Sequence, residues 1–169
     1  MIKKLEPLTP GYHAITDRTA AFPEMFMDIG VQVLPAGTTL RVYEEDQETA
    51  LLLLSGAVSF AWNGETAEVE RRSLFDETPS VLHVSRRTEA VVTAATDAEL
   101  LVQKTENANE FPARFYKSSD VTTDIFGENV WGDTARRQVR TVFDYKNAPY
   151  SNMVLGEVIN YPGKWSSYI

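Results

Sequence analysis

The residues that hold catalytic metals in β-rich enzymes are sparse in this sequence. Metal sites on strands typically use two histidines one residue apart, so that both imidazoles reach the same face, together with a carboxylate. This chain has two histidines in total, His13 and His83, and neither has a second histidine near it. The spacing therefore disfavours a metal enzyme built on these histidines and acidic residues, and both are expected to be structural.

Signals for nucleophilic catalysis are equally weak. Ser55-Gly56 lacks the flanking glycine of a nucleophile elbow, and Ser166-Ser167 follows a turn with no base nearby in the sequence. The chain contains no cysteine, so it offers no thiol nucleophile, no thiolate ligand and no disulfide, which suits a reducing compartment. We therefore assign no catalytic residue and no metal ligand within the 169 residues.

The charged residues occur in short runs that are typical of solvated surface. The acidic runs fall in predicted turns, and the basic pairs lie beside acids and favour surface ion pairs over an anion site: Glu44–Asp46, Asp76-Glu77, Arg71-Arg72, Arg86-Arg87 and Arg136-Arg137. Arg140 differs, because in RRQVRTVF it lies in a predicted strand, where a guanidinium can fork onto a carboxylate.

Composition sets limits on partners and location. The formal charge of −8 and the pI near 4.8 oppose binding to a phosphate backbone, so we expect no nucleic-acid partner. The longest apolar run, residues 50–54, is too short to span a bilayer, and Pro7 and Pro10 interrupt the start before an apolar signal segment could form. We expect a cytoplasmic protein without membrane contact.

The elements that must position these residues are predicted to be β-strands. In residues 25–34, apolar side chains at 27, 29, 31 and 33 alternate with a mixed face, as in a half-buried strand. Asn63-Gly64 is a strong hairpin signal, because a type I′ turn needs positive φ at both positions. Strands are predicted over 25–34, 38–43, 50–54, 57–62, 66–70, 80–85, 89–95, 99–103, 138–144 and 152–160.

The strands suggest a division of the chain. Residues 1–104 are predicted to form one all-β sandwich or barrel, 105–120 a connector, and 121–169 the beginning of another β unit. Alternation predicts a barrel core that consists of Met27, Ile29, Val31, Val33, Leu40, Val42, Leu52, Leu54, Val58, Phe60, Leu82, Val84, Val92 and Leu101.

The order of these segments resembles that of the 5-deoxy-glucuronate isomerase family, which groups with the 4-deoxy-5-hexosulose-uronate ketol-isomerases. The resemblance covers nearly the whole chain, from GYHAIT through VQVLPAGTTLRV and ETALLLLSGAVSFAWNGE to the end. Its most specific parts are R-x-V-R (Arg137, Val139, Arg140) and E-V-x-x-x-P-G-x-W-S-S-Y (Glu157 to Tyr168).

The resemblance implies a cupin-type jelly roll: the N-terminal cupin of a bicupin, plus the opening strands of the second. It implies an aldose–ketose isomerisation of a deoxy-uronate in myo-inositol breakdown, assisted by a divalent, zinc-type metal. In the family, W-S-S-Y is followed by Pro-Pro-His-x-His, whereas position 169 here is Ile. The resemblance therefore implies a chain truncated before the metal ligands, inactive by itself and without a cofactor of its own.

The general cupin pattern also bears on the first barrel. Gly37 and Gly56 can be laid over its bounding glycines and Glu48 roughly over its carboxylate, but the histidine positions fall near Tyr43 and Glu45. The first domain is therefore expected to be a scaffold or an oligomer surface. Candidates to contact a substrate or to support the missing ligands come from the last strands: Arg137, Arg140, Glu157, Lys164, Trp165, Ser166 and Ser167.

One alternative stays open: a non-catalytic cupin module that binds a sugar acid or a partner chain. Strands between 138 and 160 would expose edges and apolar faces, which chains usually cover by pairing. We therefore expect them to pack on the first barrel or to meet a second copy in a homodimer.

Overall fold

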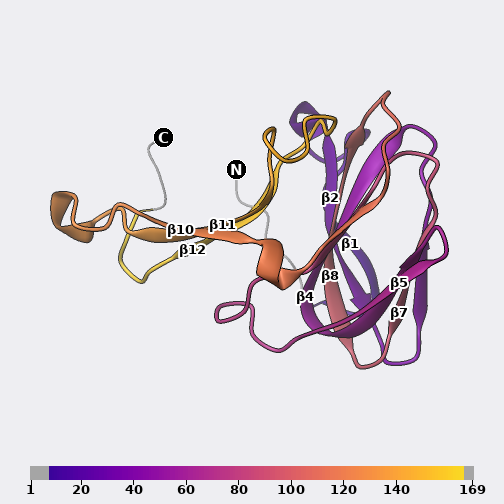
Figure 1. Ribbon diagram of the computed structural model, residues 1–169, viewed down its shortest axis with the longest axis horizontal. Coiled ribbons are helices and arrows are strands. Elements are labelled where there is room, and N and C mark those ends of the chain that lie inside the picture. Colours follow the sequence, from indigo (N-terminus) through magenta and orange to yellow (C-terminus); the bar gives the residue numbers. More distant parts are fainter. Residues whose placement is uncertain (1–7, 166–169) are drawn as a thin grey trace.

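Antiparallel β-strands make up the regular structure of the protein in a computed structural model that describes residues 8–165 (Figure 1). The strands are β1 (Gly11–Thr16), β2 (Met27–Leu34), β3 (Thr39–Val42), β4 (Gln47–Trp62), β5 (Glu65–Arg71), β6 (Val81–Val84), β7 (Ala90–Ala94), β8 (Ala98–Glu106), β9 (Arg114–Tyr116), β10 (Thr122–Phe126), β11 (Arg137–Phe143) and β12 (Leu155–Asn160). Short 3-10 helices are η1 (Pro23–Met25), η2 (Ser118–Asp120) and η3 (Trp131–Asp133).

Strands β1 to β9 form a barrel of two sheets that share β4. One sheet has the order β1-β2-β8-β4-β6-β9, and in the other β3 pairs with β7 while β4 lies between β5 and β7. His13 lies within β1, which the sequence did not predict as a strand, and its Nε2 is 2.7 Å from the carbonyl oxygen of Thr9. Segment 105–120, predicted as a connector, contributes β9, which pairs with β6.

A single long strand, β4, passes from one sheet to the other. Residues 50–54 and 57–62, predicted as separate strands, are its two halves: the first pairs with β6 and β8, the second with β5 and β7. The change occurs near Gly56, which has φ +94° and would place a Cβ 2.3 Å from the carbonyl oxygen of Asp97. The bend therefore requires glycine.

The barrel interior is filled with apolar side chains. It contains Leu34, Val42, Leu51, Leu53, Val58, Phe60, Trp62, Leu82, Val84, Ala90, Val92, Ala94, Ala98, Leu100 and Val102, with Leu40 packed against them. The prediction was correct for β3, β6, β7 and the second half of β4. It was wrong for the first half of β4 and for β8, where Leu51, Leu53, Leu100 and Val102 point inward instead of Leu52, Leu54 and Leu101.

A second core on the outer face of the barrel explains this error. Ala50, Leu52, Val81, Tyr116, Val142, Phe143, Ala148, Met153 and Leu155 form it, with Met27, Leu54 and Leu101 at its margin. Because residues 142–155 cover this face, β4 is apolar on both sides and its alternation carries no information about the inward direction. In β2, Leu34 points inward, so Ile29, Val31 and Val33 lie on the opposite face from the predicted one.

Strands β10, β11 and β12 form a separate antiparallel sheet, here called the arm, which projects from the barrel (Figure 1). Its base is anchored, since Val142 and Phe143 at the end of β11 belong to the outer core. Its outer part is solvated: every residue of β10 is exposed. The base of the arm thus packs on the barrel, as do Ala148 and Met153 of the strap, which is defined as residues 144–154.

Candidate functional site

The sequence-predicted candidates Arg140 and Glu157 meet at the base of the arm. They are directly opposite each other on β11 and β12. A third residue, Arg71, comes from the end of β5 on the barrel and is 2% exposed. Ala67, Val69 and Arg71 share one face of β5 by alternation, and the first two pack against the barrel core. Strand geometry thus sends the Arg71 guanidinium inward, under the loop formed by residues 72–80.

The three side chains form what we call the Arg71–Glu157–Arg140 clamp. Arg71 Nη1 and Nη2 donate to the two carboxylate oxygens of Glu157, each at 2.8 Å. Arg140 Nη1 donates to Glu157 Oε2 at 3.3 Å. The expectation that Arg140 pairs with a carboxylate is thereby met within the chain itself.

The clamp also binds the backbone of the 72–80 loop. The carbonyl oxygen of Glu77 accepts from Arg71 Nη2 at 2.8 Å and from Arg140 Nη1 at 2.7 Å, and that of Leu74 accepts from both guanidiniums. Both arginine side chains are almost fully buried and Glu157 is 13% exposed. Because the carboxylate and carbonyls occupy the terminal nitrogens, the clamp is suited to fixing the arm on the barrel rather than to binding a ligand.

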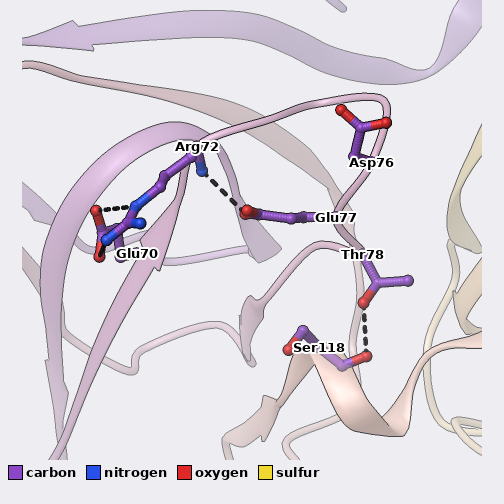
Figure 2. Close-up of a pocket in the computed structure, with 6 residues that line it drawn as sticks. All are labelled: Glu70, Arg72, Asp76, Glu77, Thr78 and Ser118. Carbon is purple, nitrogen blue, oxygen red and sulfur yellow. Dashed lines mark hydrogen bonds and ion pairs between the residues drawn. The ribbon is translucent and has the colours of Figure 1, made fainter.

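An open cavity of about 460 Å³ lies against the same loop (Figure 2). Glu70, Arg72, Asp76, Glu77, Thr78 and Ser118 line it. Arg72 Nε and Nη2 donate to the Glu70 carboxylate at 2.8 and 3.0 Å, which holds the pKa of Glu70 below its usual value. Since Glu70 neutralises Arg72, the carboxylates of Asp76 and Glu77 dominate the cavity, and a sugar acid would be repelled.

A second buried polar group joins the strap to the outer face of the barrel. Glu48 on β4 and His83 on β6 are both fully buried, with His83 Nε2 2.8 Å from Glu48 Oε2. Ser151 Oγ donates to Glu48 Oε2 at 2.9 Å, and the backbone N–H of Asn152 donates to Oε1 at 2.6 Å. The His83 ring stacks on Phe143 with centroids 4.4 Å apart.

Glu48, His83, Ser151 and Asn152 form what we call the Glu48 cluster. The comparison of Glu48 with a cupin metal ligand was wrong. Glu48 and His83 share the outer face of their strands with Ala50, not the barrel interior. Its carboxylate accepts bonds from the strap, so its role is to hold the strap. The structural role expected for His83 is in keeping with this position.

The remaining candidates lie at the other end of the arm. Arg137 Nη1 donates to the carbonyl oxygen of Ala135 and its guanidinium lies over the Phe126 ring, 5.4 Å from the centroid. Trp165 is 68% exposed, and its backbone N–H donates to Thr134. Lys164 is half-buried beside it. Ser166 and Ser167 lie outside the described residues. Of the five candidates within residues 8–165, the structure joins Arg140 and Glu157.

The residues that the structure describes do not fit a divalent metal. Among residues 8–165, no three histidine or acidic side chains gather into a group that could hold a metal ion. His83 Nε2 lies within hydrogen-bond distance of the Glu48 carboxylate, and His13 Nε2 lies within hydrogen-bond distance of the carbonyl oxygen of Thr9.

No described helix has the length and apolarity needed to cross a membrane.

Comparison with known proteins establishes the family. The model of the KduI/IolB family matches residues 3–169, almost the entire sequence. The chain belongs to the KduI/IolB family. Within it, 5-deoxy-glucuronate isomerase from Geobacillus kaustophilus is 30% identical over 146 residues, which are 85% of this chain and 51% of that protein. The enzyme of the same name from Geobacillus thermodenitrificans is 28% identical over 146 residues, 52% of its length.

The chain therefore spans about half the length of the curated relatives that it matches. Among solved structures, an IolB-like protein from Salmonella typhimurium LT2 has a TM-score of 0.73 at 23% identity, covering 83% of this chain and 53% of that one. This likeness, together with the two-sheeted antiparallel barrel, confirms the all-β prediction of a cupin-type jelly roll.

Proposed function

We propose that this chain is one part of a sugar-acid isomerase that converts 5-deoxy-glucuronate, an aldose–ketose isomerisation in myo-inositol catabolism in the cytoplasm. The observation that carries the proposal is the match to KduI/IolB proteins named for this activity, over 85% of the chain. The reaction moves a proton between adjacent carbons of the sugar acid.

The described residues would serve this reaction as a scaffold. The barrel interior is packed largely with apolar side chains, and the buried polar residues Gln32, Gln47 and Thr49 share the inward faces of β2 and β4. The Arg71–Glu157–Arg140 clamp holds β11 and β12 at a fixed position on the barrel, and both strands belong to the segment that resembles the family most specifically. We propose that the metal ligands lie outside residues 8–165 and that the 169-residue chain alone does not catalyse the isomerisation.

Two proteins test this proposal: the 169-residue chain and a chimera that joins it to the part of the Geobacillus kaustophilus enzyme left uncovered by the match. Both are assayed for 5-deoxy-glucuronate isomerisation with Zn²⁺ or Mn²⁺. The chimera is expected to be active and the chain inactive. Activity of the chain alone would refute the scaffold role, and a folded, metal-loaded chimera without activity would count against the isomerase assignment.

A second candidate function is that of a non-catalytic module that binds a partner chain, here a second copy. It is favoured by the arm, whose edge strand β10 is exposed throughout and has Ile125 and Phe126 41% and 46% exposed. Such edges pair readily with another strand. The proposal predicts a dimer in light scattering and a shift to monomer on Ile125→Lys. A monomeric wild-type chain would rule this dimer out.

A further inference from the structure

A cavity remote from the clamp lies between the loop that joins β1 to β2, the end of β8 and the strap. It has a volume of about 580 Å³, within the range of small-molecule sites. Its lining includes Arg18, Pro23, Phe26, Glu106 and Asn152. The proposed isomerase role uses none of these residues.

One wall of the cavity is aromatic. Phe26 is one of its lining residues and is 77% exposed, the largest exposed fraction among the large apolar residues of the described chain. Its backbone is in the left-handed region at φ +55°, and Phe22 in the same loop is at φ +64°. Such a conformation is strained for a residue other than glycine.

The backbone of Phe26 is held in this position from two sides. Its N–H donates to Pro23 at 3.1 Å, and its carbonyl accepts from Thr105 Oγ1 at 3.2 Å. The loop is thus tied down at both groups while the ring remains in solvent. An exposed phenyl ring provides an apolar platform for the C–H face of a sugar ring.

The groups opposite the aromatic wall are polar. The Arg18 guanidinium contacts the carboxylates of Glu106 and Asp46, the latter at 3.1 Å. Asn152 Nδ2 donates to the backbone carbonyl oxygen of Glu106 at 2.8 Å, and this bond does not use the Oδ1 atom of Asn152. Carboxylate and carboxamide groups can together accept from and donate to adjacent hydroxyls.

The charge around the cavity restricts the ligand. Arg18 contributes one positive charge, whereas Asp28, Asp46 and Glu106 around it contribute three negative charges. The local excess of two negative charges would repel a carboxylate. The cavity therefore combines the apolar Phe26 ring, groups that can bind hydroxyls and an excess of negative charge. These features fit a sugar ring that carries no negative charge.

We propose that this cavity is a binding site for a polyhydroxylated ring without negative charge, distinct from any site for the sugar-acid substrate. Phe26 packs against the ring, while Asn152 and Glu106 bind its hydroxyls. The affinity expected for one such ring in an open cavity is in the millimolar range, about −4 kcal/mol.

Three sugars that differ in charge test the proposal: D-glucose, D-glucosamine and D-glucuronate. Ligand-observed saturation-transfer NMR and amide chemical-shift titration of the 169-residue chain would measure binding. Glucose and glucosamine are expected to bind and to shift amides of residues 18–26 and 152, with glucuronate at least about fivefold weaker. Binding of glucosamine without glucose would show recognition of the ammonium group and would overturn the proposal, as would preferred binding of glucuronate or no binding by any sugar.

A pair of variants locates the site. Phe26→Ala is expected to weaken glucose binding at least about fivefold, because the aromatic platform is lost. Tyr145→Ala is the matched control, since Tyr145 is 73% exposed and does not line the cavity. Equal affinity of the Phe26 variant and the wild type would place the sugar elsewhere and refute this site. This outcome is independent of the isomerase assays.

Discussion

Arg71 and Glu157, 86 residues apart in the sequence, form a two-pronged ion pair in which both N···O distances are 2.8 Å. Arg71 ends a barrel strand and Glu157 lies in the arm, so one buried pair joins the two parts of the molecule. Bidentate geometry fixes orientation as well as distance.

Arg71→Met is expected to lower the free energy of unfolding by about 3–5 kcal/mol, because it leaves the Glu157 carboxylate and loop carbonyls buried without their donor. Urea unfolding measures the effect. The neighbouring Arg72→Met is the control: Arg72 is 77% exposed, so its loss should cost less than about 1 kcal/mol. If Arg71→Met does not fold, the milder Glu157→Gln takes its place, and equal stability of the clamp and control variants would contradict the clamp.

Glu48→Gln is expected to loosen the strap without unfolding the barrel. Glu48 accepts from Ser151 and from the Asn152 N–H, and an amide cannot accept at both of its terminal atoms. The cost should be about 2 kcal/mol, seen as faster hydrogen exchange at Asn152 and earlier proteolysis within 144–154. Glu45→Gln, at an exposed position, should change neither. Unchanged exchange in the Glu48 variant would show that the outer apolar core alone holds the strap.

Gly56→Ala tests the bend in β4. The added Cβ would lie 2.3 Å from the Asp97 backbone oxygen at a φ of +94°, so backbone must move, at a cost of about 2–4 kcal/mol. Gly64→Ala is the control: its φ is +82°, but no atom lies within 4 Å of the added Cβ. That change should cost about 1 kcal/mol. Thermal unfolding that ranks the two variants in the reverse order would refute the steric explanation.

Tyr116 predicts a pH dependence above pH 10. Burial raises the pKa of its phenol above the ordinary value of about 10, so the unfolded chain loses this proton first. Stability should therefore decline above pH 10, with a contribution from this residue of up to about 1.4 kcal/mol per pH unit. Tyr116→Phe should flatten the decline in melting temperature between pH 9 and 11, whereas Tyr145→Phe, at a 73% exposed position, should not. Identical pH profiles of wild type and Tyr116→Phe would contradict this account.

The strands could be predicted because most have one buried face. In β6 and β7 the alternation assigns Leu82, Val84 and Val92 to the interior correctly. The first half of β4 gave no such signal, since Leu51 and Leu52 are both buried, one inside the barrel and the other beneath the strap. A strand covered on both faces loses the period that distinguishes them.

The candidate site also contains residues that the sequence indicated and residues that it did not. Arg140 and Glu157 were found from the family motif, whereas Arg71 was taken for half of a surface pair. Its alternation with Ala67 and Val69 was an available signal of burial. For Glu48 and His83 the sequence contained no such signal of burial, because their partner, the strap, lies more than sixty residues further along the chain.

Composition, local alternation and motif order are properties of the linear chain, and they suffice for the β-rich architecture, the absence of thiol chemistry, the family and two members of the clamp. Three features emerge only in the folded molecule: the face of β4 that points inward, the place of Arg71 in the clamp and the contact of Glu48 with the strap. Each of these depends on a contact between residues far apart in sequence. A buried ionic group becomes favourable only where folding brings its partners within hydrogen-bond distance.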